Sequence, residues 1–72
     1  MSTINFPIDY FIEAKEDGNL SLGTSEVRIN DAIQLFENGD IISLTNLNKT
    51  VSNENELRAI IEQYLNTKEK TN

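Results

Sequence analysis

Apolar and polar residues alternate along the first part of the chain. From position 4 to position 14 the even positions are apolar or aromatic, and the odd positions are mostly polar. This period of two is typical of a strand with one face in a core. Because Pro7 cannot donate a hydrogen bond to a neighbouring strand, we predict the strand over Ile8–Ala14. Phe11 is the exception, a large aromatic residue on the face that carries Asp9 and Glu13.

A turn follows this strand, and side-chain parity selects its length. The three-residue loop Glu16-Asp17-Gly18 sets Leu22 opposite Ile12 on the apolar face. A two-residue loop sets Leu22 opposite Glu13, on the polar face. The third position of the longer loop needs a left-handed backbone, which Gly18 adopts without strain. We therefore predict an N-terminal hairpin with the three-residue loop.

Two interpretations of the next segment stay open. The apolar positions change from even to odd between Leu22 and Val27, so the chain has to bend or bulge there. In the first interpretation Glu26–Ile29 is a short third strand. In the second, a helix already begins at Thr24 or Ser25.

A short helix is predicted over Asp31–Asn38, with Asn30 as its cap and Gly39 as its stop. Its apolar stripe has the spacing i, i+3, i+4 and i+7 of one helix face. The stripe consists of Ile29, Ala32, Ile33 and Phe36. A strand is predicted over Ile41–Leu47, which has apolar residues at both parities. That pattern fits a strand covered on both faces.

The clearest helix is predicted over Asn53–Asn66. Asn53 caps its first turn, and Glu56 is placed to reach back towards the cap. The apolar stripe of this helix consists of Leu57, Ile60, Ile61, Tyr64 and Leu65. The opposite face has charged residues spaced by four and is expected to be solvated. They are Glu54, Arg58 and Glu62.

These elements predict an α+β fold in the order β-β-(β)-α-β-α. We expect a small, mainly antiparallel sheet of three or four strands that begins with the N-terminal hairpin. Both helices pack on one face of it. That face is lined by Ile8, Tyr10, Ile12, Leu20 and Leu22. Residues 1–66 form a single compact domain, and 67–72 form a polar tail that frays.

The charge and the hydropathy of the chain limit the kinds of partner that we expect. Twelve acidic against six basic residues give a net charge of −6. This charge repels phosphate backbones, so we expect no direct binding to nucleic acid. It favours a protein partner with a basic surface, although solubility alone also accounts for a charge of this size. No apolar run reaches the length of a membrane span, so we expect a cytoplasmic protein without a membrane partner.

The residue inventory argues against an enzyme. The sequence has no His, no Cys and no Trp. The usual catalytic base, the thiol nucleophile and the preferred zinc ligands are therefore missing. The acidic turn at 16–19 lacks the regular ligand spacing of a calcium loop. We expect no catalytic residues, no metal and no cofactor.

Protein binding is the class of function that remains. Phe11, flanked by Asp9 and Glu13, is predicted to present an aromatic anchor of the kind enriched at interface centres. Ile41 and Leu47 are predicted to lie on the second face of the sheet, which the helices leave open. The alternative for Phe11 is that the N-terminal segment or the second face of the sheet covers it. The surface would serve a homodimer or a larger partner.

Two functions fit this interpretation. The first is a small acidic module that binds another protein, as do many phage- or plasmid-encoded inhibitors of host nucleic-acid-handling proteins. The second is a structural or accessory subunit that acts through homo- or hetero-oligomerisation. A complex led by charge weakens steeply with salt, whereas one led by apolar contacts does not.

Overall fold

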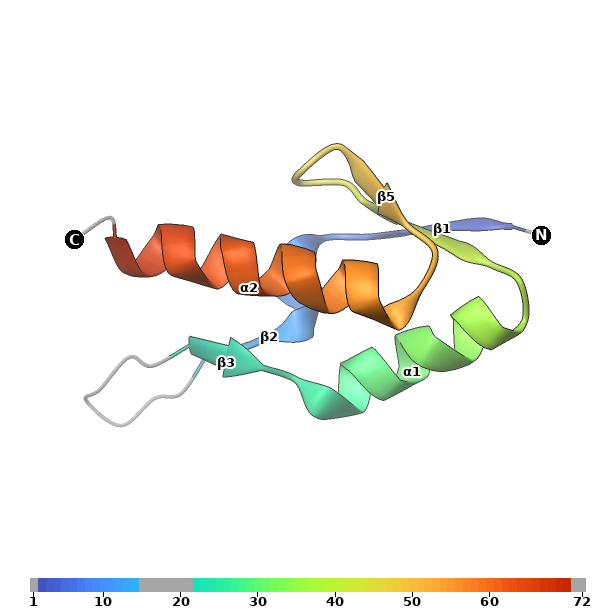
Figure 1. Cartoon of the computed structure of the whole chain (residues 1–72), viewed down its shortest axis with the longest axis horizontal. Helices are drawn as coiled ribbons and strands as arrows, with labels where there is room; N and C mark the ends of the chain where they lie inside the picture. Colours follow the sequence, from blue (N-terminus) through green and yellow to red (C-terminus); the bar gives the residue numbers. More distant parts are fainter. Residues whose placement is uncertain (1, 15–21, 71–72) are drawn as a thin grey trace.

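The computed structural model describes residues 2–14 and 22–70, and it confirms an α+β fold (Figure 1). The elements in chain order are β1 (Thr3–Phe6), the 3₁₀ turn η1 (Ile8–Phe11), β2 (Ile12–Ala14), β3 (Leu22–Thr24), α1 (Glu26–Glu37), β4 (Ile41–Leu44), β5 (Lys49–Val51) and α2 (Glu54–Lys70). The strands form a three-stranded sheet in the order β1-β4-β5 and a two-stranded sheet of β2 and β3.

The larger sheet is mixed, with β4 at its centre. β1 runs parallel to β4, with Thr3 opposite Ile41 and Phe6 opposite Leu44. β5 runs antiparallel to β4. The expectation of a mainly antiparallel sheet is therefore wrong for β1. The first strand pairs with a strand far along the chain, and the hairpin and α1 lie in the connection between them.

The predicted strand over Ile8–Ala14 is wrong in its first half. The chain ends β1 before Pro7, whose φ is −72°, and then enters the 3₁₀ turn η1. Such a turn has three residues per turn, so residues i and i+3 lie on the same side. Ile8 and Phe11 therefore both face inward, and both are fully buried. Only Ile12–Ala14 is extended.

β2 and β3 form the predicted hairpin, in a register shifted by two residues. Ile12 lies opposite Thr24, where Leu22 was expected. A shift by an even number of residues keeps the same side chains on the same face. The predicted faces of the two strands are therefore correct, and the predicted cross-strand partners are wrong. Leu20 and the predicted loop Glu16-Asp17-Gly18 lie outside the described residues.

α1 begins directly after Ser25, which is its N-cap. The interpretation in which a helix already begins at Thr24 or Ser25 is thus correct, and the short third strand over Glu26–Ile29 is wrong. The N–H of Ser25 donates to the carbonyl oxygen of Phe11 at 2.9 Å, so one residue ends the hairpin ladder and starts the helix. Asn30 lies inside α1 and is not its cap. Gly39 has a φ of +93° at the helix end, as predicted.

β4 follows the predicted strand as far as Leu44 and ends three residues early. There the N–H of Leu47 donates to the carbonyl oxygen of Leu44 at 3.0 Å, which closes a turn. Asn48 adopts a left-handed backbone, with a φ of +55°, and the chain returns as β5. The sequence pattern did not predict this strand. Its one apolar residue, Val51, is buried.

α2 starts where it was predicted and runs to Lys70, four residues past the predicted end. The N–H of Glu56 donates to Oδ1 of Asn53 at 2.9 Å, which confirms the cap. The Glu56 carboxylate reaches back one residue further than expected. It accepts the N–H of Ser52 at 3.0 Å.

The core lies between the three-stranded sheet and the two helices. Both helices pack on one face of a sheet, as expected, but the face belongs to β4 and β5 and not to the hairpin (Figure 1). Among the described residues, the buried apolar side chains come from η1, both helices and these two strands. They are Ile8, Phe11, Ile29, Ala32, Ile42, Leu44, Val51, Leu57 and Ile61.

Replacing Phe11 tests this core directly. We expect Phe11→Ala to lower the free energy of unfolding by about 3–5 kcal/mol, because it removes a fully buried ring. The matched control is Val27→Ala in α1, since Val27 is 73% exposed. The control should stay within about 0.5 kcal/mol of the original protein. Urea denaturation followed by circular dichroism measures both, and equal effects would contradict a buried Phe11.

The two described glycines provide a second test. A Cβ added at either position meets nothing within 4 Å, but only Gly39 has a positive φ. Gly39→Ala should therefore cost about 1–2 kcal/mol through backbone strain. Gly23→Ala should leave the free energy of unfolding unchanged or slightly raised. If the two variants melt alike, the left-handed end of α1 is not as described.

Candidate interaction surface

The five residues expected to bind a partner do not form one surface. Phe11 is fully buried, whereas Asp9 and Glu13 are exposed. Ile41 and Leu47 are both half-buried. Asp9, Phe11 and Glu13 have different surroundings, because η1 turns the chain between Asp9 and Glu13.

Phe11 belongs to the core, and the expectation that it is exposed is wrong. Its ring lies 5.9 Å from that of Phe6, edge-on at 70°. The Tyr10 ring lies 5.1 Å away on another side, at 89°. Phe6 belongs to the N-terminal strand, so the alternative in which the N-terminal segment covers Phe11 is confirmed.

The two acids beside Phe11 have separate roles. The hydroxyl of Tyr64 donates to Oδ1 of Asp9 at 2.9 Å, which ties η1 to α2 across the molecule. Tyr64 is half-buried, with its hydroxyl at the rim as predicted. Glu13 lies in β2 opposite Gly23 and faces solvent. Neither acid lies next to an exposed aromatic anchor at position 11.

Ile41 and Leu47 lie on opposite sides of the sheet. Side chains alternate along β4, and Ile42 and Leu44 face the helices, so Ile41 faces away from them. The register places polar residues around it on that outer face. They are Thr3, Asn5, Ser43 and Thr50. The second face of the sheet is therefore mostly polar and carries no continuous apolar patch.

Leu47 lies instead at a hollow between the β4–β5 hairpin and α2. The hollow has a volume of about 370 Å³ and a mainly apolar lining. It is lined by Leu47, Lys49, Ile60, Gln63, Tyr64 and Thr67. The sequence did not reveal this site, because its two walls come from elements whose contact depends on the tight turn at Asn48.

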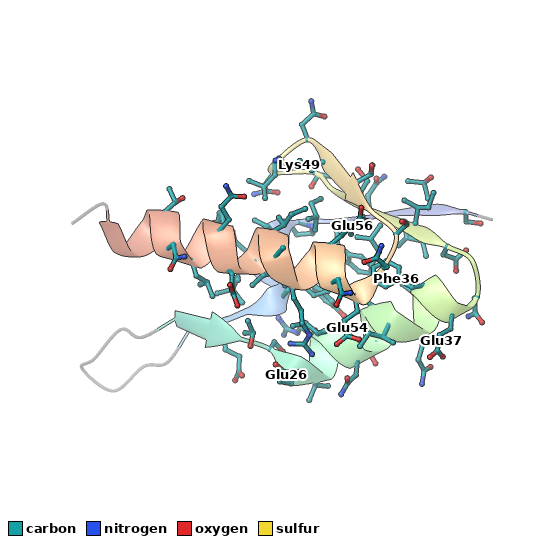
Figure 2. All side chains as sticks on the ribbon, in the orientation of Figure 1. Glu26, Phe36, Glu37, Lys49, Glu54 and Glu56 are labelled. Carbon is teal, nitrogen blue, oxygen red and sulfur yellow. The ribbon has the colours of Figure 1, made fainter. Side chains whose placement is uncertain are left out.

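A different group of residues gathers where α1 and α2 meet. Arg58 of α2 binds Glu26 of α1 through two hydrogen bonds, Nη2 to Oε1 at 2.9 Å and Nη1 to Oε2 at 3.1 Å. The Nε of Arg58 donates to Oε2 of Glu54 at 2.8 Å. One guanidinium thus holds two carboxylates from two helices. Figure 2 shows Glu26 and Glu54 on the side of the molecule where the helices meet.

This arrangement shifts the pKa values of both partners in the ion pair, Glu26 and Arg58. Hydrogen bonds from Arg58 lower the pKa of Glu26 below its usual value, against a smaller opposing effect of desolvation. Hydrogen bonds to Glu26 and then to Glu54 raise the pKa of Arg58 above its usual value. The two carboxylates and the guanidinium together carry one formal negative charge.

The helix period extends this charge along both elements. Glu37 follows Glu26 by eleven residues, which is about three turns and leaves it on the same stripe of α1. Glu62 follows Glu54 by eight residues on α2, within about a quarter turn. We call these four residues, Glu26, Glu37, Glu54 and Glu62, the acidic face. Figure 2 shows Glu37 further along α1 from Glu26.

The basic residues whose side chains the structure describes do not cancel this charge. Arg58 is held by two carboxylates. Arg28 turns to η1, where its Nη1 donates to the carbonyl oxygen of Tyr10 at 2.9 Å and its guanidinium lies over the Tyr10 ring. Lys49 is at the tip of the β4–β5 hairpin, on the other side of α2 from Glu26 (Figure 2). The acidic face therefore presents net negative charge on two helices.

Comparison of the chain with protein-family models, with curated proteins and with solved structures finds no match. Within residues 2–14 and 22–70, no three acidic side chains gather as metal ligands. Over the same residues, no helix has the length and apolar content needed to cross a membrane. The case for a site therefore rests on the chemistry of the surface.

The lowered pKa of Glu26 predicts a pH effect on stability. A carboxylate whose pKa is lowered by folding stabilises the fold above its unfolded pKa, and this contribution is lost as the pH falls through the folded value. The free energy of unfolding should therefore fall more steeply between about pH 6 and pH 3 in the original protein than in Glu26→Gln. Glu37→Gln is the control, since Glu37 has no ion pair among the described residues. If all three curves run parallel, Arg58 does not act on Glu26.

Proposed function

We propose that the protein is a non-enzymatic binding module whose acidic face docks onto a basic surface of another protein. The observation that carries the proposal is the binding of Arg58 by Glu26 and Glu54. These two ion pairs use the positive charge of Arg58, the one arginine within the acidic face. The other carboxylates of the face, Glu37 and Glu62, then have no ion pair among the described residues. The net charge of −6 gives the whole molecule the matching long-range field.

The geometry of the face supports recognition as well as attraction. The carboxylates stand on two helices that share a core, and helices hold side chains more precisely than loops do. The bidentate contact between Arg58 and Glu26 also fixes the position of α1 against α2. Less conformational freedom is then lost when a partner binds, which favours affinity.

A protein that itself handles nucleic acid is the partner that fits this chemistry best. Such proteins bind phosphate backbones with grooves of Lys and Arg. Glu26 and Glu37 stand about 16 Å apart along α1, at a rise of about 1.5 Å per residue. Carboxylates spread over this distance can contact several basic side chains of one groove at once. Occupation of the groove would exclude nucleic acid, so this module would act as an inhibitor.

The hollow between α2 and the β4–β5 hairpin favours a second function. Leu47, Ile60 and Tyr64 give it an apolar lining. An accessory subunit that docks an apolar side chain of a larger assembly there would bind with little dependence on salt. The acidic face would then serve solubility alone.

Paired charge variants separate the two functions. The face variant Glu37→Gln/Glu62→Gln and the control variant Glu13→Gln/Asp31→Asn remove the same charge, but Glu13 and Asp31 lie off the acidic face. All four side chains are exposed, so both variants should fold. Cross-linking in extract of the source cell identifies the partner, and titration of that purified partner then gives the affinity.

We expect the face variant to lose about tenfold or more in affinity, while the control variant changes little. The affinity of the original protein should also fall steeply between about 50 and 500 mM salt. Equal losses in the two variants, or an affinity that salt does not change, would contradict the acidic face and favour the hollow.

A further inference from the structure

β1 forms an open edge of the three-stranded sheet, since β4 is its one neighbour there. The carbonyl oxygens of Ser2 and Phe6 accept hydrogen bonds from β4 and the residue after it, Ile41 N–H at 2.8 Å and Thr45 N–H at 3.1 Å. In a parallel ladder alternate residues bond to the same neighbour. The backbone groups of Thr3 and Asn5 therefore point the other way. No described residue bonds to them.

Within residues 2–14 and 22–70, this edge lacks the charged side chains, the bulges and the covering element that keep many strand edges apart. Natural edges are blunted by charged side chains, by bulges or by a covering element. Residues 2–8 carry no charge at all, although a quarter of the chain is charged. The other edge of the sheet, β5, has only three residues and carries Lys49. Figure 1 shows β1 leading to the N-terminus, at the opposite end of the molecule from the C-terminus.

We propose that the β1 edge binds a second copy of this chain, as an antiparallel β1–β1 pair with its two-fold axis at Ile4. In this register Thr3 lies opposite Asn5 of the second copy, and Asn5 lies opposite its Thr3. Each of these pairs exchanges two backbone hydrogen bonds, so all four outward groups of each copy are satisfied. The sheet becomes six-stranded, in the order β5-β4-β1-β1-β4-β5.

The edge is self-complementary, and this is why the occupant is a second copy. Its outward groups are a donor and an acceptor at Thr3 and the same at Asn5, arranged symmetrically about Ile4. Pro7 has no N–H, so the pairing ends before it. Two copies with a net charge of −6 repel each other elsewhere on their surfaces, and a stretch without charge is where they can meet.

The size of the contact sets the strength of the dimer. Two four-residue strands form an interface well below the ~1,200 Å² of a standard stable complex. We therefore expect a weak dimer, with a Kd of about 0.1–1 mM. Added salt should strengthen it, because screening reduces the repulsion between the copies. Binding of a basic partner through the acidic face responds to salt in the opposite direction, so the two proposals fail independently.

Two measurements test the dimer in the original protein, with any purification tag at the C-terminus. Sedimentation equilibrium between about 10 μM and 1 mM should show a monomer that converts to a dimer. Amide exchange measured by NMR at the two ends of this range should show slower exchange at Thr3 and Asn5 as the dimer forms. The amides that bond within the β1–β4 pair should respond much less.

The variant Asn5→Pro removes one outward donor and no bond to β4, since the Asn5 N–H points away from β4. The control Asn5→Thr keeps the N–H. We expect Asn5→Pro to weaken the dimer at least tenfold and Asn5→Thr to leave it intact. A protein that stays monomeric at about 1 mM overturns the proposal. So does a dimer in which Thr3 and Asn5 exchange no more slowly, and this readout decides the question even if the proline variant unfolds.

Discussion

The burial of Phe11 together with Ile8 is the packing interaction on which the rest of the fold depends. The 3₁₀ turn that places both side chains inward also positions the residues on either side of it. Tyr10 stacks on Phe6 of β1 at 4.7 Å, the Phe11 carbonyl accepts the N–H of Ser25 before α1, and Asp9 accepts the hydroxyl of Tyr64 on α2. One turn of four residues thus connects the N-terminal strand, the hairpin and both helices.

This use of the apolar residues determines what is left on the surface. Phe11 lies in the core and the outer face of the sheet is mostly polar, so the described part of the chain presents no exposed aromatic anchor at position 11. Besides the hollow between α2 and the β4–β5 hairpin, the described residues form two surfaces of opposite kinds. The acidic face carries ordered carboxylates around Arg58, and the β1 edge carries backbone groups without charge. We propose a different kind of partner for each, and we expect salt to act on the two complexes in opposite directions.

The sequence predicted features that depend on neighbouring residues and missed those that depend on distant ones. The stripe of α2, its Asn53 cap and the left-handed Gly39 follow from local periodicity and backbone preference. The turn at η1 was missed because Ile8, Tyr10 and Ile12 keep the even spacing of a strand, while packing imposes a period of three. The pairing of β1 with β4 and the contact between Glu26 and Arg58 join residues more than thirty positions apart, and no local pattern encodes them.

NMR can show whether Ile8–Phe11 is a turn that buries Phe11. In that case Asp9 and Tyr10 have the small N–H to Hα couplings of a helical turn. Nuclear Overhauser effects should then connect the Phe11 ring protons with those of Phe6 and with core methyl groups. Large couplings of extended chain through these residues, with a Phe11 ring that contacts solvent and no core methyl group, would contradict it.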